Sequence, residues 1–210
     1  MVSWTRSSTS SARLDVARSA TRGCGQRTER LERARRARSG PGPRTTETAH
    51  PSTTAAPVIA SHSATRALAD HPRNMDDDML RAVARNGGVV MVNLQDVLID
   101  PEKASVWKAL STTVWNLGWP RTPLAGLLDH MDHAVAVAGI DHVGVGSDFA
   151  STFFMPEGLT DVAGYPNITL GLVERGYPDD AARKVLGENV LRALSKAKAT
   201  RDRLRDSLRP

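Results

Sequence analysis

The chain has 210 residues, enough for one ordinary domain, and its formal net charge is +5. A single cysteine, Cys24, excludes an internal disulfide framework and a cysteine-rich zinc motif. Apolar runs of roughly 18 residues are absent, and no apolar segment follows the basic residue Arg6. We therefore expect neither a membrane-spanning helix nor a secretory signal, and a cytoplasmic location.

Residues 1–56 differ in composition from the rest of the chain. They hold eleven arginines, no lysine and four acidic residues, together with many Ser, Thr, Gly and Pro residues. Residues 29–38 could form a charged helix, but its only large apolar residue is Leu31, and the Gly-Pro-Gly-Pro run at 40–43 excludes regular structure. We expect a disordered Arg/Ser/Thr-rich leader. Such a basic tail leaves open binding to nucleic acid or an anionic surface, although Trp4 is its only aromatic residue.

From Pro57 onward the pattern predicts strands that alternate with helices. Residues 57–61 form a short apolar run typical of a buried parallel strand. We expect Asn74 to cap a helix with three aspartates in its first turn, which Gly87-Gly88 ends. A second buried strand is predicted at residues 89–94.

The second half of the chain continues this alternation. Residues 95–120 are loosely patterned. We then expect Thr122 to cap a helix with Pro123 at its first position, which ends near Gly139. Residues 142–148 predict a third strand that ends in Asp148. Two further helices are predicted, the first at about 169–175 and the second from Pro178 onward, before a charged C-terminal extension at 195–210.

This order indicates an α/β fold with parallel strands. The ordered part, residues 57–194, is too short for a complete eight-stranded α/β barrel, which needs roughly 200 residues or more.

Three polar residues are candidates for chemistry, because two lie at predicted strand ends, where parallel α/β folds place their active sites, and the third lies on a loop at the same mouth. His62 follows the first strand and is a candidate metal ligand or a loop histidine. Asp148 ends the third strand and is a candidate metal ligand, proton-transfer group or loop cap. Arg73, on a loop, could bind a carboxylate with two parallel hydrogen bonds.

His130 and His133 form an i, i+3 pair, which invites interpretation as a zinc site. They flank the apolar stripe of a helix expected to cover the outside of the sheet, so we favour a structural role.

Several ordered segments resemble the membrane (renal) dipeptidase family of zinc metallopeptidases, over about residues 57–194. The matching segments are Pro57–Ser63, His71–Asn74, Gly87–Asn93, Asp129–His133, Gly144–Phe149, Pro156–Leu159 and Gly187–Arg192. The resemblance implies a (β/α)₈ barrel that hydrolyses dipeptides with two zinc ions, and it makes this chain the part with about strands six to eight. By the same resemblance His62 is a zinc ligand, Arg73 binds the terminal carboxylate of the dipeptide, and Asp148 is the catalytic acid/base.

The chain also departs from this family. The family needs a His-x-Asp motif, a bridging glutamate and one more histidine upstream, but before Pro57 this chain has only His50, Asp15 and three glutamates. One ligand of five cannot hold two zinc ions. We therefore expect a truncated chain, inactive alone and unable to retain zinc, behind a leader unrelated to the family. A non-catalytic remnant or interaction protein is the alternative.

Overall fold

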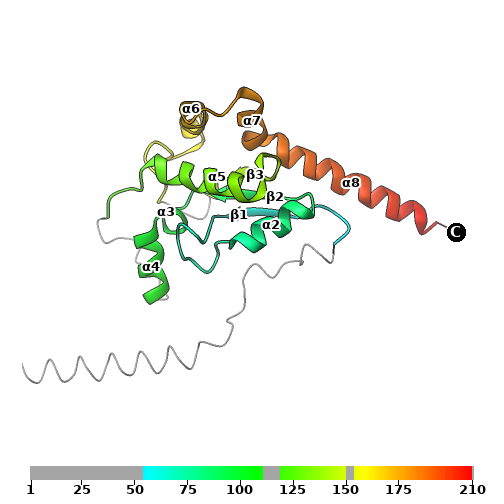
Figure 1. Cartoon of the computed structure of the whole chain (residues 1–210), viewed down its shortest axis with the longest axis horizontal. Helices are drawn as coiled ribbons and strands as arrows, with labels where there is room; N and C mark the ends of the chain where they lie inside the picture. Colours follow the sequence, from blue (N-terminus) through cyan, green and yellow to red (C-terminus); the bar gives the residue numbers. More distant parts are fainter. Residues whose placement is uncertain (1–53, 111–118, 150–153, 210) are drawn as a thin grey trace, which may run out of the picture. The chain divides into compact units, whose positions relative to one another are not determined.

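Three parallel strands form a sheet within the residues that this computed structural model describes, which are 54–110, 119–149 and 154–209. The strands lie in the order β1-β2-β3 and are β1 (Ile59–Ser63), β2 (Val89–Asn93) and β3 (Val143–Gly146). Helices follow the strands, so the predicted α/β fold with parallel strands is confirmed (Figure 1). Of the leader predicted to be disordered, residues 1–56, residues 1–53 lie outside the described residues. Its last residues are placed against the fold, because the carbonyls of Thr54 and Ala56 accept hydrogen bonds from Asn86 Nδ2 at 3.4 and 3.2 Å.

The first strand reaches two residues further than predicted, so His62 lies within β1 and not after it. Between Ala60 and Ser63 the register against β2 slips by one residue. Two residues of β1, Ser61 and His62, therefore span the interval that Met91 alone spans on β2, as in a β-bulge. Bulges turn side chains away from the regular pleat and are frequent beside active sites.

Asp76 and not Asn74 caps the helix α2 (Asp77–Arg85). The Asp76 carboxylate accepts a hydrogen bond from the backbone N–H of Met79 at 2.9 Å. The predicted cap was wrong because the Asn74 side chain is fully buried and forms hydrogen bonds with other segments of the chain instead. Its Nδ2 donates to the carbonyls of Ala69 and Leu98 at 2.8 and 2.7 Å.

Two helices that the sequence did not predict, α3 (Asp96–Ile99) and α4 (Pro101–Leu110), lie in the loosely patterned stretch at residues 95–120. Asp100 caps α4, because its Oδ1 accepts the backbone N–H groups of Glu102 and Lys103 at 3.0 Å each. An aspartate followed by proline is a regular helix-start signal.

The helix α5 (Leu124–Ala138) begins where predicted, but Thr122 does not cap it. The hydroxyl of Thr122 lies 3.2 Å from Asp100 Oδ2 and 2.9 Å from Lys103 Nζ. Lys103 Nζ also lies 2.7 Å from Asp96 Oδ2. Only 5% of the Asp96 side chain and 13% of the Lys103 side chain are exposed. This nearly buried ion pair joins α3, α4 and the segment before α5.

The C-terminal part of the described chain is helical. Its elements are two 3₁₀ turns, η1 (Ile140–His142) and η3 (Val162–Gly164), the helices α6 (Tyr165–Glu174) and α7 (Asp179–Arg183), one π turn, η4 (Lys184–Glu188), and α8 (Asn189–Ser207). The helix α8 runs unbroken across the domain boundary expected after Leu194. Among residues 54–110, 119–149 and 154–209 no helix combines the length and apolar character needed to cross a bilayer.

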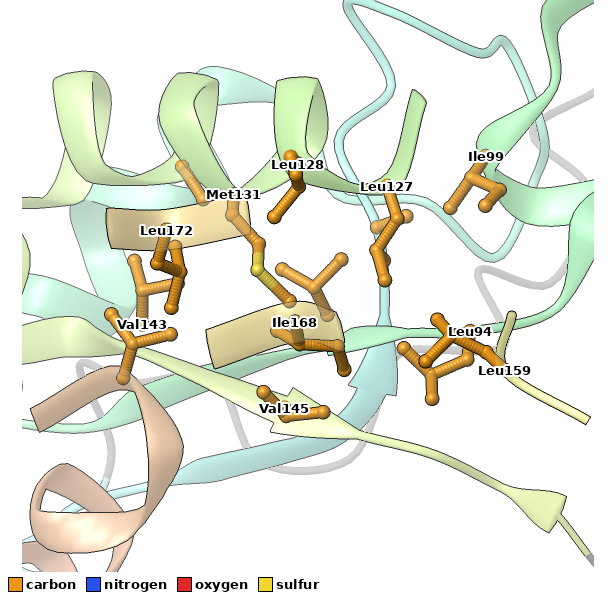
Figure 2. Packing of buried hydrophobic residues seen from close by; sticks show 14 of the residues in the cluster. Leu94, Ile99, Leu127, Leu128, Met131, Val143, Val145, Leu159, Ile168 and Leu172 are labelled. Atoms are coloured by element: carbon orange, nitrogen blue, oxygen red, sulfur yellow. The ribbon is translucent and has the colours of Figure 1, made fainter. Parts of the chain in front are cut away.

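The main core lies between α5, α6 and the sheet (Figure 2). Leu127 and Met131 of α5 point toward the sheet, in the same cluster as Val143 and Val145 of β3, and Ile168 of α6 lies below Met131. All but Val145, which is 8% exposed, are fully buried. Burial of such side chains contributes roughly 1.5–3 kcal/mol each. This core fixes β3, and therefore the segment that carries Asp148.

The first turn of α8 is anchored at the amino ends of the strands. Asn189 Nδ2 donates to the carbonyls of Ile140 and Val143 at 2.7 and 2.8 Å. Arg192 donates to the carbonyls of Gly87 and Asp141 at 3.0 and 2.5 Å. The segment Gly187–Arg192 therefore has a structural role in this chain.

Candidate active site

Arg73 and Asp148 lie together near the carboxyl ends of the strands. Arg73 belongs to the loop between β1 and α2, and Asp148 comes two residues after β3. One guanidinium nitrogen of Arg73 (Nη2) is 3.9 Å from Asp148 Oδ2, and the two side chains are 36% and 22% exposed. This distance is an ion-pair separation and exceeds that of a hydrogen bond.

Asp148 has a left-handed backbone, with φ of 55°. Among the described residues it is the only non-glycine with positive φ. Aspartate tolerates this region better than most residues, yet such a conformation is unusual and needs support from its surroundings.

Two buried amides also contact the Asp148 carboxylate. Asn93 Nδ2 donates to Asp148 Oδ2 at 3.4 Å, and Gln95 Nε2 donates to the same oxygen at 3.3 Å. Their residues are 0% and 4% exposed. The sequence interpretation missed both. Asn93 had a usable signal, because it is a polar residue at the end of a buried strand, whereas Gln95 had none.

Hydrogen bonds to the backbone of Arg73 hold the loop that carries this residue. Ser63 Oγ donates to the Arg73 carbonyl at 2.8 Å, and the Arg73 N–H donates to Nδ1 of His71 at 3.2 Å. Burial, and secondly the charge of Arg73, lowers the pKa of His71 from 6.5 to about 4. His71 is therefore neutral near pH 7 and can accept this bond. Its ring packs against Trp107, with ring centroids 4.1 Å apart.

His62 lies on the bulged part of β1 and is exposed, with Nδ1 2.6 Å from Ser61 Oγ. The Ser61 carbonyl approaches the end of β3 so closely that a Cβ on Gly146 would lie 2.1 Å from its oxygen. Glycine at this position therefore allows the ends of β1 and β3 to come together.

The described donors do not fit a two-zinc centre. Within residues 54–110, 119–149 and 154–209 no three His, Cys, Asp or Glu side chains gather in a group that could hold one metal ion. A binuclear centre needs more ligands than one. His62 and Asp148 remain single donors at the strand ends.

His130 has a structural role, because both of its ring nitrogens are used inside the protein. The ring is 1% exposed, and Nδ1 lies 3.1 Å from the Thr65 N–H nitrogen and 2.7 Å from its hydroxyl. Nε2 lies 3.1 Å from the Ile99 carbonyl. Burial lowers the pKa of His130 from 6.5 to about 4. His133 contacts Asp77 of α2 at 2.8 Å, so it links α5 to α2.

The aspartates of the same α5 segment are also engaged. Asp129 and Asp132 pair with Arg175, which follows α6. Asp132 also accepts a hydrogen bond from the Tyr177 hydroxyl at 2.6 Å. Burial, and secondly this hydrogen bond, raises the pKa of Tyr177. The segment Asp129–His133 therefore joins α5 to its neighbours.

A sequence model of the membrane dipeptidase family, peptidase family M19, matches residues 43–208. The match begins before the predicted boundary at residue 57 and ends beyond residue 194. An uncharacterized dipeptidase of Schizosaccharomyces pombe is 36% identical over 159 residues, which cover 75% of this chain and 34% of that protein. Dipeptidase tcpJ of Claviceps purpurea is 36% identical over 141 residues, which cover 66% of this chain and 29% of that protein. The chain thus spans about a third of the length of these relatives.

Solved structures give the same relationship. A metallopeptidase of Rhodobacter sphaeroides, liganded with a phosphinate mimic of the dipeptide L-Ala-D-Ala, has a TM-score of 0.59 and 26% identity, covering 70% of this chain and 38% of that one. The probable dipeptidase PvdM of Pseudomonas aeruginosa has a TM-score of 0.61 and 28% identity, and the match covers 71% of this chain and 47% of that one. Sequence and structure agree, and the chain belongs to the membrane dipeptidase family.

Proposed function

We propose that this chain carries the carboxylate-binding and proton-transfer part of a dipeptidase active site. The observation that supports the proposal is the placement of Arg73 beside Asp148 at the carboxyl ends of the strands. Membership of a dipeptidase family supports a dipeptide as the substrate class. Strands β1, β2 and β3 would then be strands six to eight of a (β/α)₈ barrel. The leader outside the barrel would be shorter than the predicted residues 1–56, because the family match begins at residue 43.

Arg73 is suited to bind the terminal carboxylate of a dipeptide. A guanidinium can form two parallel hydrogen bonds with a carboxylate. Ser63 and His71 form hydrogen bonds with the Arg73 backbone, so the loop that carries the guanidinium is held in place. The side chain is 36% exposed, so a ligand from solvent can reach it.

Asp148 is suited to move a proton. Its carboxylate accepts hydrogen bonds from Asn93 and Gln95, and it lies beside the group that would bind the substrate. Proton transfer to the departing amine by a positioned carboxyl group contributes typically about 10²–10⁴-fold to a hydrolysis rate. Asp148 would hold that role next to the dipeptide.

His62 would be a zinc ligand of such a site. The described residues do not supply the other donors of a two-zinc centre. We therefore assign no step of the reaction to zinc in this chain. We propose that these 210 residues alone neither retain two zinc ions nor hydrolyse dipeptides at an enzyme-like rate. A non-catalytic protein that recognises carboxylates is the second candidate function, and the absence of a grouped donor set among the described residues favours it.

Binding of glycylglycine tests the role of Arg73. Hydrogen bonds to charged groups contribute about 1.5–3 kcal/mol, so Arg73→Ala should weaken binding about 10- to 100-fold. Arg73→Lys should weaken it less, because it keeps the charge but loses the planar fork. Arg81→Ala is the matched control, because Arg81 lies on α2 and pairs with Asp77 and Asp78. Equal affinities of wild type and Arg73→Ala, by NMR titration, would remove this part of the proposal.

A further inference from the structure

The side chains of Asn93 and Gln95 converge on one oxygen atom. Both donate to Oδ2 of Asp148, at 3.4 and 3.3 Å, from residues that are 0% and 4% exposed. Both distances are slightly longer than the usual range of about 2.7–3.2 Å, so each is a weak hydrogen bond from a neutral donor, which leaves the charge of the carboxylate intact. Two such bonds from buried groups together favour one position of Oδ2.

The orientation of the Asn93 amide is fixed by a second bond. Its Oδ1 accepts the backbone N–H of Gln95 at 2.6 Å, so Nδ2 faces Asp148. A flipped amide would lose this bond and turn its oxygen toward the carboxylate. Asn93 therefore fixes the backbone of Gln95 and donates to Asp148 at the same time.

The sheet places these amides beside Asp148. Asn93 is the last residue of β2 and pairs in register with Gly146, the last residue of β3. Asp148 follows two residues later with its left-handed φ of 55°. A strained conformation of this kind persists only where surrounding contacts fix it. The hydrogen bond from Asn93, on the neighbouring strand, to Oδ2 is a contact that can fix the conformation of Asp148.

Arg73 alone is a poor support for a catalytic Asp148. Its guanidinium is 3.9 Å from Oδ2, too far for a hydrogen bond. A bound dipeptide would present a second carboxylate to the same guanidinium, and the two carboxylates would compete for it. The amides of Asn93 and Gln95 carry no charge for the substrate to attract, so they can keep Asp148 in place when substrate binds.

We propose that Asn93 and Gln95 are positioning residues that hold the Asp148 carboxylate, so that Arg73 is left to the substrate. The inference rests on the proposed function for its purpose, but the contacts themselves can be tested without any ligand. It assigns a role to Gln95, which lies in a loop that the sequence did not connect with the site.

A double-mutant cycle on the whole chain measures the contact. Gln95→Met removes the donor with little change in size, and Asp148→Gly removes the carboxylate while tolerating positive φ. We expect the two effects on the unfolding equilibrium constant to be non-additive by about 3- to 10-fold in urea titrations. Additivity within about twofold would overturn the proposal.

Asn189→Ala with Asp148→Gly is the matched control cycle. Asn189 is also a buried amide, but it binds the carbonyls of Ile140 and Val143 at the opposite end of β3. Residues separated by more than about 10 Å usually act additively, so this cycle should show no coupling. Coupling of the same size in both cycles would overturn the proposal, because it would indicate a general loss of stability.

Solid-state NMR on the wild type covers the case in which a variant fails to fold. We expect a dipolar contact between Gln95 Nε2 and Asp148 Cγ that persists in Arg73→Ala and after addition of glycylglycine. Loss of the contact in either case would show that Arg73 holds Asp148, and would overturn the proposal. Persistence of the contact without glycylglycine binding would instead refute the proposed function and leave the positioning role intact.

Discussion

Acidification should destabilise this protein through His130. The His130 pKa is lowered from 6.5 to about 4 by burial, so protonation is easier in the unfolded chain than in the folded one. The contribution of neutral His130 is complete above about pH 6.5 and is lost as the pH falls toward 4. At about 1.4 kcal/mol per pH unit, the loss amounts to about 3 kcal/mol.

His130→Gln isolates this contribution, because glutamine does not titrate. At pH 7 the variant should be less stable by about 1–3 kcal/mol, since it reproduces the bonds to Thr65 and Ile99 poorly. The gap between wild type and variant should shrink as the pH is lowered toward about 4. Urea unfolding followed by tryptophan fluorescence at several pH values gives the gap. His71, whose pKa is also lowered to about 4, is present in both proteins and cancels.

Ile168→Val is the control for the His130 experiment. Ile168 is fully buried in α6 and carries no titratable group. Its substitution should cost about 0.5–1.5 kcal/mol at every pH tested. A gap between wild type and His130→Gln that stays constant or widens on acidification would refute the reasoning.

Two further predictions concern the fold around the site. Lys103→Met should cost about 3–5 kcal/mol in thermal unfolding, because it leaves the nearly buried Asp96 without its cation, and adding Asp96→Asn should recover part of the loss. An unchanged melting temperature in Lys103→Met would contradict this. Gly146→Ala should cost about 1–3 kcal/mol or more, because its Cβ would lie 2.1 Å from the Ser61 carbonyl oxygen. Unchanged stability of Gly146→Ala would contradict this.

The strands and the main helices could be predicted because their patterns are local. The apolar run of β2 and the apolar stripe of α5 can be recognised in the sequence without knowing what packs against them. The start of α4 was missed although Asp100-Pro101 is a local signal, because the segment lacks a clear apolar stripe. Asn74 and Thr122 were assigned as caps by residue type, but each is used in longer-range hydrogen bonds.

The candidate site was predictable only in part. Position after a strand end made Asp148 a candidate, and the family resemblance implied the roles that we propose for Asp148 and Arg73. Asn93 and Gln95 could not be assigned in the same way. Their contacts with Asp148 depend on the register between β2 and β3 and on the turn after β2, which no local pattern in the sequence contains.

Zinc content and dipeptide hydrolysis, measured together on the purified 210-residue chain, test the central claim most directly. The sample should be dialysed, cleared of host peptidases and compared with His62→Ala. We predict less than one tightly held zinc ion per chain and no hydrolysis above that of His62→Ala, because the described residues supply no grouped set of metal donors. Two zinc ions per chain, with hydrolysis that His62→Ala abolishes, would contradict the account.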